Sequence, residues 1–211
     1  MEEQLSQLET VGAAVRGRLA AKHAAREKAL PRCREAIRHC ANSIRATHRG
    51  EFAQAEALLG QARDSLSQVH HDLEGHGDVY HAGFLHDAEK ECAEAAITLA
   101  MVAGRPLPRP DELEVADAAY LNGMGEAVGE LRRYLLDRLR QGEVASSERI
   151  LVAMEEFYHL LVTIDFPEAI TGGLRRTTDS VRGILERTRG DLTLAMTQER
   201  LHKKIESLEK G

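Results

Sequence analysis

Two groups of glutamates carry the residue types that could do chemistry in this chain of 211 residues. The first lies in AEKECAEAAITLAMVAG, residues 88–104, where Glu91 and Glu94 stand at the edge of an apolar stretch. At helical spacing these glutamates and Asp87 gather beside an apolar stripe that packs on a core. Carboxylates in such low-dielectric surroundings need protons, basic partners or a metal ion. The alternative is a solvated first turn, because acidic residues also favour helix N-termini.

The second group lies in GMGEAVGELRR, residues 123–133, where Glu126 and Glu130 share one face of a predicted helix. Three glycines within seven residues each cost about 1 kcal/mol of helix stability relative to alanine, so we expect either a tight helix crossing or room beside the carboxylates. Together the two groups offer oxygen ligands suited to Mg²⁺ or Mn²⁺. Glu130 has an alternative role as a surface ion-pair partner of Arg133.

A competing interpretation comes from two Glu-x-x-His pairs, Glu156 with His159 and Glu199 with His202. A di-iron four-helix bundle uses such pairs as ligands. The second pair lies in TQERLHKKIESLEK, residues 197–210, where so many charges favour an ordinary solvated helix face.

A basic stretch at residues 20–50 is a candidate nucleic-acid contact, because local positive charge on a chain of net charge −6 can follow a phosphate backbone. The stretch lacks interleaved aromatic residues, so base stacking and sequence preference should be slight. A solvated helix face is again the alternative. The expected contacts are Arg26, Lys28, Arg34, Arg38, Arg45 and Arg49.

Composition limits the class of protein. Aromatic residues are 4% of the chain with no tryptophan, a composition that favours helices packed on helices. Three cysteines without a close pair, no signal-like N-terminus and no long apolar run predict a cytoplasmic protein that does not enter a membrane. The length predicts a single domain over residues 1–211.

Hydrophobic periodicity predicts an all-α bundle of six or seven helices, of which the first and last are long, and no strand. We expect Pro31 to kink or divide the first helix and Ser147 to be the N-cap of the fifth. Such long helices favour packing between subunits. The expected ranges are 2–48, 52–75, 84–104, 111–140, 147–165 and 174–208.

The order of these segments resembles the translin family over nearly the whole chain. REKALPRCREAIRHCANSIRATHRGEF is similar to the family's first helix, YLNGMGEAVGELRRYLLDRL to its acidic segment, and FYHLLVTIDFPEAITGGLRRTTDSVRGILER to its final loop and long helix. The resemblance implies an all-α subunit that assembles into hollow, octamer-like particles and binds single-stranded RNA or DNA.

The resemblance also implies roles for the glutamates. In the translin-associated factor X branch, an Mg²⁺-dependent endoribonuclease, the catalytic pattern is Glu-x-x-Glu followed by an acidic residue in the later segment. Here Glu91, Glu94 and Glu126 match that pattern, although the family has aspartate where this chain has Glu126. Glu130 is then a further ligand or a neighbour of the ligands.

We therefore expect a homo-oligomer that binds single-stranded RNA and cuts it with water activated by Mg²⁺ or Mn²⁺. The alternative is a translin-like oligomer that binds single-stranded RNA or DNA without cutting it.

Overall fold

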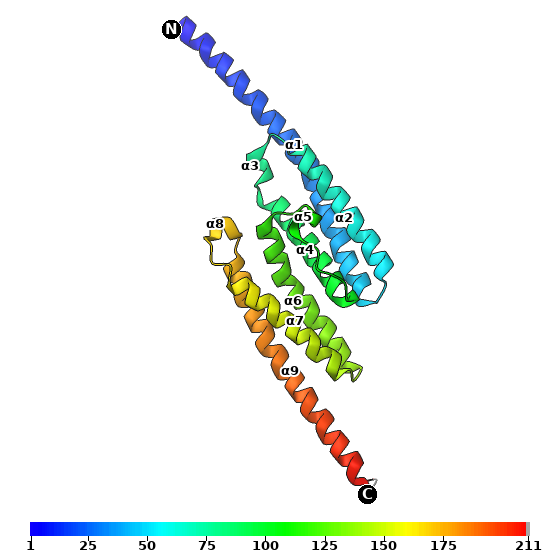
Figure 1. Ribbon diagram of the computed structural model, residues 1–211. Helices are drawn as coiled ribbons and strands as arrows, with labels where there is room; N and C mark the ends of the chain where they lie inside the picture. The colour runs from blue at the N-terminus through cyan, green and yellow to red at the C-terminus, as the bar shows by residue number, and fades with distance from the viewer. Residues whose placement is uncertain (210–211) are drawn as a thin grey trace.

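The computed structural model describes residues 1–209, which are helical without any strand (Figure 1). The expected all-α fold with long first and last helices is confirmed. Three of the nine described helices are single turns of four residues, α3, α5 and α8, which the hydrophobic pattern did not predict. The helices are α1 (Glu2–His48), α2 (Phe52–Asp72), α3 (Gly77–Tyr80), α4 (Gly83–Ala103), α5 (Pro110–Leu113), α6 (Asp117–Arg140), α7 (Val144–Val162), α8 (Glu168–Thr171) and α9 (Leu174–Glu209).

The long helices form two neighbouring groups joined by the contact of α4 with α6. In the first group, α1 packs against α2 and α4, and in the second, α6 packs against α7 and α9. The start of α1 and the end of α9 project beyond these groups at opposite ends of the molecule (Figure 1). None of the helices in the described part of the chain is long and apolar enough to cross a membrane.

The first helix runs without interruption through Pro31, so the expected division there is wrong. Pro31 lies on the exposed side of α1, whereas Ala29, Cys33 and Ala36 are buried. Packing of the buried side holds the helix together across the residue that cannot donate a backbone hydrogen bond.

Two other expected boundaries also differ. The range 111–140 is divided because Glu114 takes a left-handed conformation (φ 57°) that ends α5, and α6 begins at Asp117. Ser147 is a buried residue of α7 rather than its N-cap, and its hydroxyl donates a hydrogen bond to the Glu143 carbonyl one turn back. A serine inside a helix satisfies its hydroxyl in this way without help from the helix end.

The crossing of α4 and α6 is close because α6 has no side chain at Gly123. A Cβ atom at this position would lie 2.5 Å from the Lys90 carbonyl oxygen and 2.9 Å from the Glu94 backbone nitrogen. Both are backbone atoms and cannot rotate away. The glycine therefore brings the backbone of α6 directly against the turn of α4 that carries the first glutamate pair.

We predict that Gly123→Ala lowers the free energy of unfolding by about 1–3 kcal/mol, because the added methyl group forces two backbones apart. Gly129→Ala is the matched control in the same helix, since nothing lies within 4 Å of its Cβ position. The control should gain about 0.5–1 kcal/mol from helix propensity. Urea denaturation of both variants measures the difference, and equal effects would show that the crossing is not tight at Gly123.

Candidate metal site and nucleic-acid surface

Three carboxylates from two helices meet beside this crossing. Glu91 and Glu94 of α4 and Glu126 of α6 each present one oxygen, and these oxygens all lie within 4.8 Å of one another. Glu91 and Glu94 face the same way because they are three residues apart, and Glu126 follows Gly123 by about one turn. We call these residues the carboxylate cluster. All are partly buried.

The carboxylate cluster is poorly neutralised. Lys90 Nζ donates to Glu126 Oε1 over 2.7 Å, but neither Glu91 nor Glu94 accepts a hydrogen bond or forms an ion pair with any of residues 1–209. Glu89 on the same helix contrasts with them, since its carboxylate contacts His70 Nε2 at 2.8 Å and accepts from the Ala116 N–H at 3.2 Å. Glu89 is a satisfied structural residue, whereas the Glu91 and Glu94 oxygens remain available.

The electrostatics of the cluster favour added positive charge. Burial, followed by the charges of Glu91, Glu126 and Glu130, raises the pKa of Glu94 to about 8. Burial and then the Glu126 charge also raise the pKa of Glu91. A bound cation would stabilise the ionised forms of both groups. An all-oxygen donor set of this kind fits a hard divalent cation such as Mg²⁺ or Mn²⁺.

Glu130 lies one turn beyond Glu126 and outside the carboxylate cluster. Its Oε2 lies 2.5 Å from His48 Nε2, while Arg133 is 3.8 Å away. The hydrogen bond with His48 is the main reason why the pKa of Glu130 is lowered. Glu130 is therefore held by the end of α1, and its role as a metal ligand stays a prediction.

A hollow of about 450 Å³ opens beside the cluster, with α9 as its far wall. Thr177 of α9 is fixed there, because its hydroxyl donates to Asn122 Oδ1 over 2.6 Å. Arg176 is exposed and forms no ion pair with the described residues, which leaves its guanidinium free for an anion. The lining residues are Glu94, Gly125, Glu126, Arg176, Thr177, Ser180 and Ile184.

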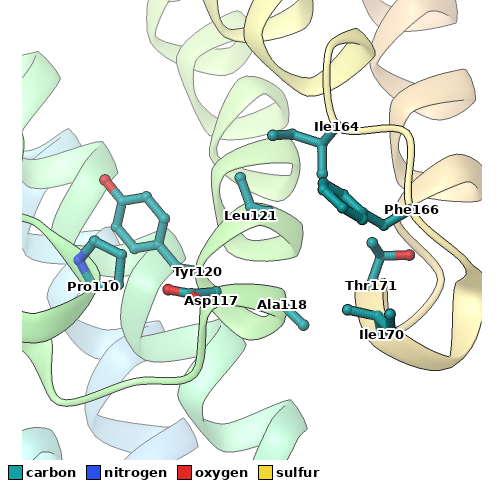
Figure 2. Close-up of a pocket in the computed structure, with 9 residues that line it drawn as sticks. All are labelled: Pro110, Asp117, Ala118, Tyr120, Leu121, Ile164, Phe166, Ile170 and Thr171. Atoms are coloured by element: carbon teal, nitrogen blue, oxygen red, sulfur yellow. The ribbon is translucent and has the colours of Figure 1, made fainter.

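A second hollow of about 410 Å³ lies between the start of α6 and the segment that joins α7 to α8 (Figure 2). Tyr120 and Pro110 line one side, and Ile164, Phe166 and Ile170 line the other. The lining is largely apolar, with Asp117 as its one ionisable carboxylate. Its chemistry suits packing more than catalysis.

The six predicted nucleic-acid contacts are all exposed, five of them on α1 and Arg49 directly after its end. Arg34, Arg38, Arg45 and Arg49 follow one another at intervals of four, seven and four residues, so they share a face opposite the buried side of the helix. Arg26 and Lys28 lie on other faces. Arg38 and Arg49 have neighbouring glutamate partners, whereas Arg34 forms no ion pair within residues 1–209. The role of these residues in binding nucleic acid stays a prediction.

The di-iron interpretation is wrong. Glu156 and His159 are 71% and 63% exposed, and His202 is 75% exposed. The two Glu-x-x-His pairs do not form a shared group of ligands in the described part of the chain, where the carboxylate cluster does. Both pairs lie on solvated faces of α7 and α9.

Sequence reasoning missed the basic residues around the glutamates. Lys90 precedes Glu91 directly, but nothing in the sequence shows that its ammonium reaches across to α6. His48 ends α1 and Arg176 lies in the first turn of α9, so only the packing of these helices places them near the glutamates. The HR pair at the end of the first helix was the one signal that could have drawn attention to His48.

No family model matches the chain. Among solved structures, AfC3PO in complex with duplex RNA aligns with a TM-score of 0.82 and 36% identity, over 88% of this chain and 96% of that chain. The crystal structure of AfC3PO aligns with a TM-score of 0.80 and 36% identity, over 88% and 97%. Apo-NeC3PO aligns with a TM-score of 0.77 but only 17% identity, over 87% and 96%, which shows the fold alone.

Among curated proteins, an uncharacterized protein of Methanocaldococcus jannaschii is 27% identical over 198 residues, which are 92% of this chain and 86% of that protein. The similarity therefore extends over nearly the whole length of these chains rather than over a shared segment.

We predict that the metal-free protein loses stability as the pH rises from about 5 to about 8. Folded Glu94 keeps its proton up to about pH 8, whereas an unfolded glutamate loses it near 4.5, so the folded state binds more protons in between. Glu94→Gln removes the group that titrates, so the free energy of unfolding should change less between pH 5 and pH 8, by on the order of 1–3 kcal/mol. Urea denaturation in EDTA across this pH range measures it.

Glu148→Gln, at an exposed position of α7, is the matched control and should follow the wild type. Parallel pH profiles for the wild type and Glu94→Gln would contradict the raised pKa.

Proposed function

The chain belongs to the translin family, which includes the C3PO proteins, and from this premise we propose that it is an RNA-binding homo-oligomer and a metal-dependent endoribonuclease. The observation that carries the proposal is the carboxylate cluster, in which Glu91 and Glu94 have no basic partner of their own among residues 1–209 and Glu94 has a pKa of about 8. Glu91, Glu94 and Glu126 would hold Mg²⁺ or Mn²⁺.

RNA is the proposed substrate because a related protein of 36% identity, AfC3PO, has been seen in complex with duplex RNA. Exposed arginines along one face of α1 provide positive charge that follows a phosphate backbone without reading bases. We propose single-stranded RNA as the strand that is cut, and duplex RNA is the obvious comparison substrate.

The bound cation would neutralise charge on the reacting phosphodiester and lower the pKa of a coordinated water. The side chains contribute the rest. One carboxylate of the cluster that is not fully engaged by the cation would accept the proton of the attacking water as a general base.

Arg176 on α9 would hold the phosphate on the other side of the same hollow. Its guanidinium donates in a planar fork that matches a phosphate group, and it lies on the wall opposite Glu94 and Glu126. Lys90 ties Glu126 to α4 and keeps this carboxylate oriented toward the cluster.

A second candidate function is RNA binding without cleavage. The observation that favours it is the 2.7 Å ion pair of Lys90 with Glu126, since an ammonium group already neutralises one of the three carboxylates. Glutamate also stands where the family has aspartate, and its longer side chain changes the reach of the ligand.

We predict that Glu91→Gln and Glu94→Gln each reduce cleavage of a labelled single-stranded RNA by roughly 100-fold or more, because each removes a charged ligand or proton acceptor. The assay compares Mg²⁺, Mn²⁺ and EDTA and includes a duplex of the same sequence. RNA binding should be unchanged, as measured by fluorescence anisotropy.

Glu148→Gln is the matched control, because it removes an exposed carboxylate of α7 that does not belong to the carboxylate cluster. Cleavage that persists in both cluster variants, or in EDTA, would remove the proposed site. Tight binding without metal-dependent cleavage by the wild type would establish the second candidate function instead.

We predict that Arg34→Glu/Arg38→Glu weakens RNA binding about tenfold or more and reduces the slope of log affinity against log salt by about 1.4 for a single strand, because two phosphate contacts are lost. The control Arg140→Glu/Arg149→Glu makes the same change in charge on exposed positions of α6 and α7. Equal losses in both variants would show a general charge effect and no role for this face of α1.

A further inference from the structure

Residues 2–24 of α1 extend away from the rest of the molecule (Figure 1). Burial along α1 begins at Ala25, and before it only Gly12 and Lys22 are partly covered. One long-range polar contact, from Lys22 Nζ to Asp78 Oδ2, ties this extension to the chain. In proteins most of a helix's stability comes from packing of its apolar side, so we expect a partner to cover the apolar side of the extension.

An exposed apolar seam runs along the extension. Leu5, Leu8, Val15 and Leu19 are 58%, 66%, 39% and 59% exposed, and Gly12 lies in line between them. These positions alternate three and four residues apart, which is the spacing of the seam of a coiled coil. Gly12 has no side chain at the middle of the seam, and the flexible Arg16 guanidinium lies over its position.

The charges on one flank of the seam are arranged for self-pairing. Glu2, Glu9, Arg16 and His23 follow one another at intervals of seven residues, with the acidic residues in the first half and the basic residues in the second. In an antiparallel pair of identical helices, this flank meets the same flank of the other copy with its halves reversed. Glu9 then lies opposite Arg16 of a second copy, and Glu2 opposite His23.

The same register also aligns the seam. With Glu9 opposite Arg16, the coiled-coil layers place Leu8 beside Leu19 of the second copy and Gly12 beside Val15. Each contact occurs twice, because the arrangement has a two-fold axis near Ala13. A parallel pair would instead set the two acidic halves side by side and lose these contacts.

We propose that residues 2–23 of α1 form an antiparallel coiled coil with the same residues of a second copy of this chain. The apolar seam supplies the buried surface, and the Glu9–Arg16 contacts set the direction and register. This pairing joins subunits through the extensions alone and does not depend on the proposed nuclease activity.

The first experiment reverses each charge in the full-length chain. Glu9→Arg and Arg16→Glu each bring like charges together twice, so each variant should self-associate about tenfold more weakly than the wild type in sedimentation velocity. Co-expression of the two variants restores both opposite-charge contacts between unlike copies and should restore association. Glu3→Arg, an exposed position off the seam, is the control and should behave as the wild type.

The outcomes distinguish self-pairing of the extension from binding of its seam to another segment. Single variants that sediment as the wild type overturn it. Single variants that weaken association without rescue on co-expression also overturn it, and point to another partner such as the exposed Leu194, Leu201 and Leu208 of α9. The thermal unfolding of the rest of the molecule should be unchanged throughout, because the substituted side chains lie outside the buried part of α1.

A cross-linking experiment tests the register. Leu8→Cys and Leu19→Cys chains, co-expressed with different tags and oxidised, should form a disulfide between unlike chains, while each variant alone should cross-link poorly. The native Cys33, Cys40 and Cys92 are buried and do not compete. Efficient cross-linking of Leu8→Cys with itself would indicate a parallel pair and overturn the proposal.

Discussion

The close approach of α4 and α6 at Gly123 is the constraint on which the candidate site depends. Because no side chain separates the helices there, the backbone of α6 rests on the turn of α4 from Lys90 to Glu94. The glutamates on both sides of that contact are then forced into one small volume. Their partial burial and then their mutual repulsion raise the pKa of Glu94 and Glu91, and a divalent cation would offset both effects.

The surrounding basic groups divide the glutamates by role. Glu89 and Glu130 each have a histidine partner, whereas Lys90 holds Glu126 and leaves Glu91 and Glu94 without a partner in the described chain. The structure thus satisfies the carboxylates that hold helices together and leaves Glu91 and Glu94 unsatisfied. This distribution is expected of a site whose carboxylates are left for a ligand.

The helical fold and the candidate ligands could be predicted from the sequence because both depend on local spacing. Glu91 and Glu94 share a face at three residues apart, Glu126 and Glu130 share a face at four, and the resemblance to the translin family singled out Glu126 as the third group. The three glycines of residues 123–129 indicated a close helix crossing, but the sequence could not show which of them lies at it. Gly123 is needed for the helix crossing and Gly125 for the packing of Thr177, but Gly129 has no close neighbour.

Other features could not be predicted, because they depend on contacts between distant parts of the chain. The sequence gives no distance between Lys90 and α6 or between His48 and Glu130. Pro31 and Ser147 were misjudged for a related reason, since burial of one side of α1 keeps it continuous across the proline and α7 begins before the serine.

The most direct test of the account is a calorimetric titration of the protein with Mn²⁺ near pH 7, repeated in two buffers of different ionisation enthalpy. The account predicts one saturable site for each chain and a binding enthalpy that differs between the buffers, because the cation displaces the proton that Glu94 retains at this pH. The absence of saturable binding would contradict the claim that the crossing of α4 and α6 builds a cation site, and saturable binding without proton release would contradict the raised pKa of Glu94.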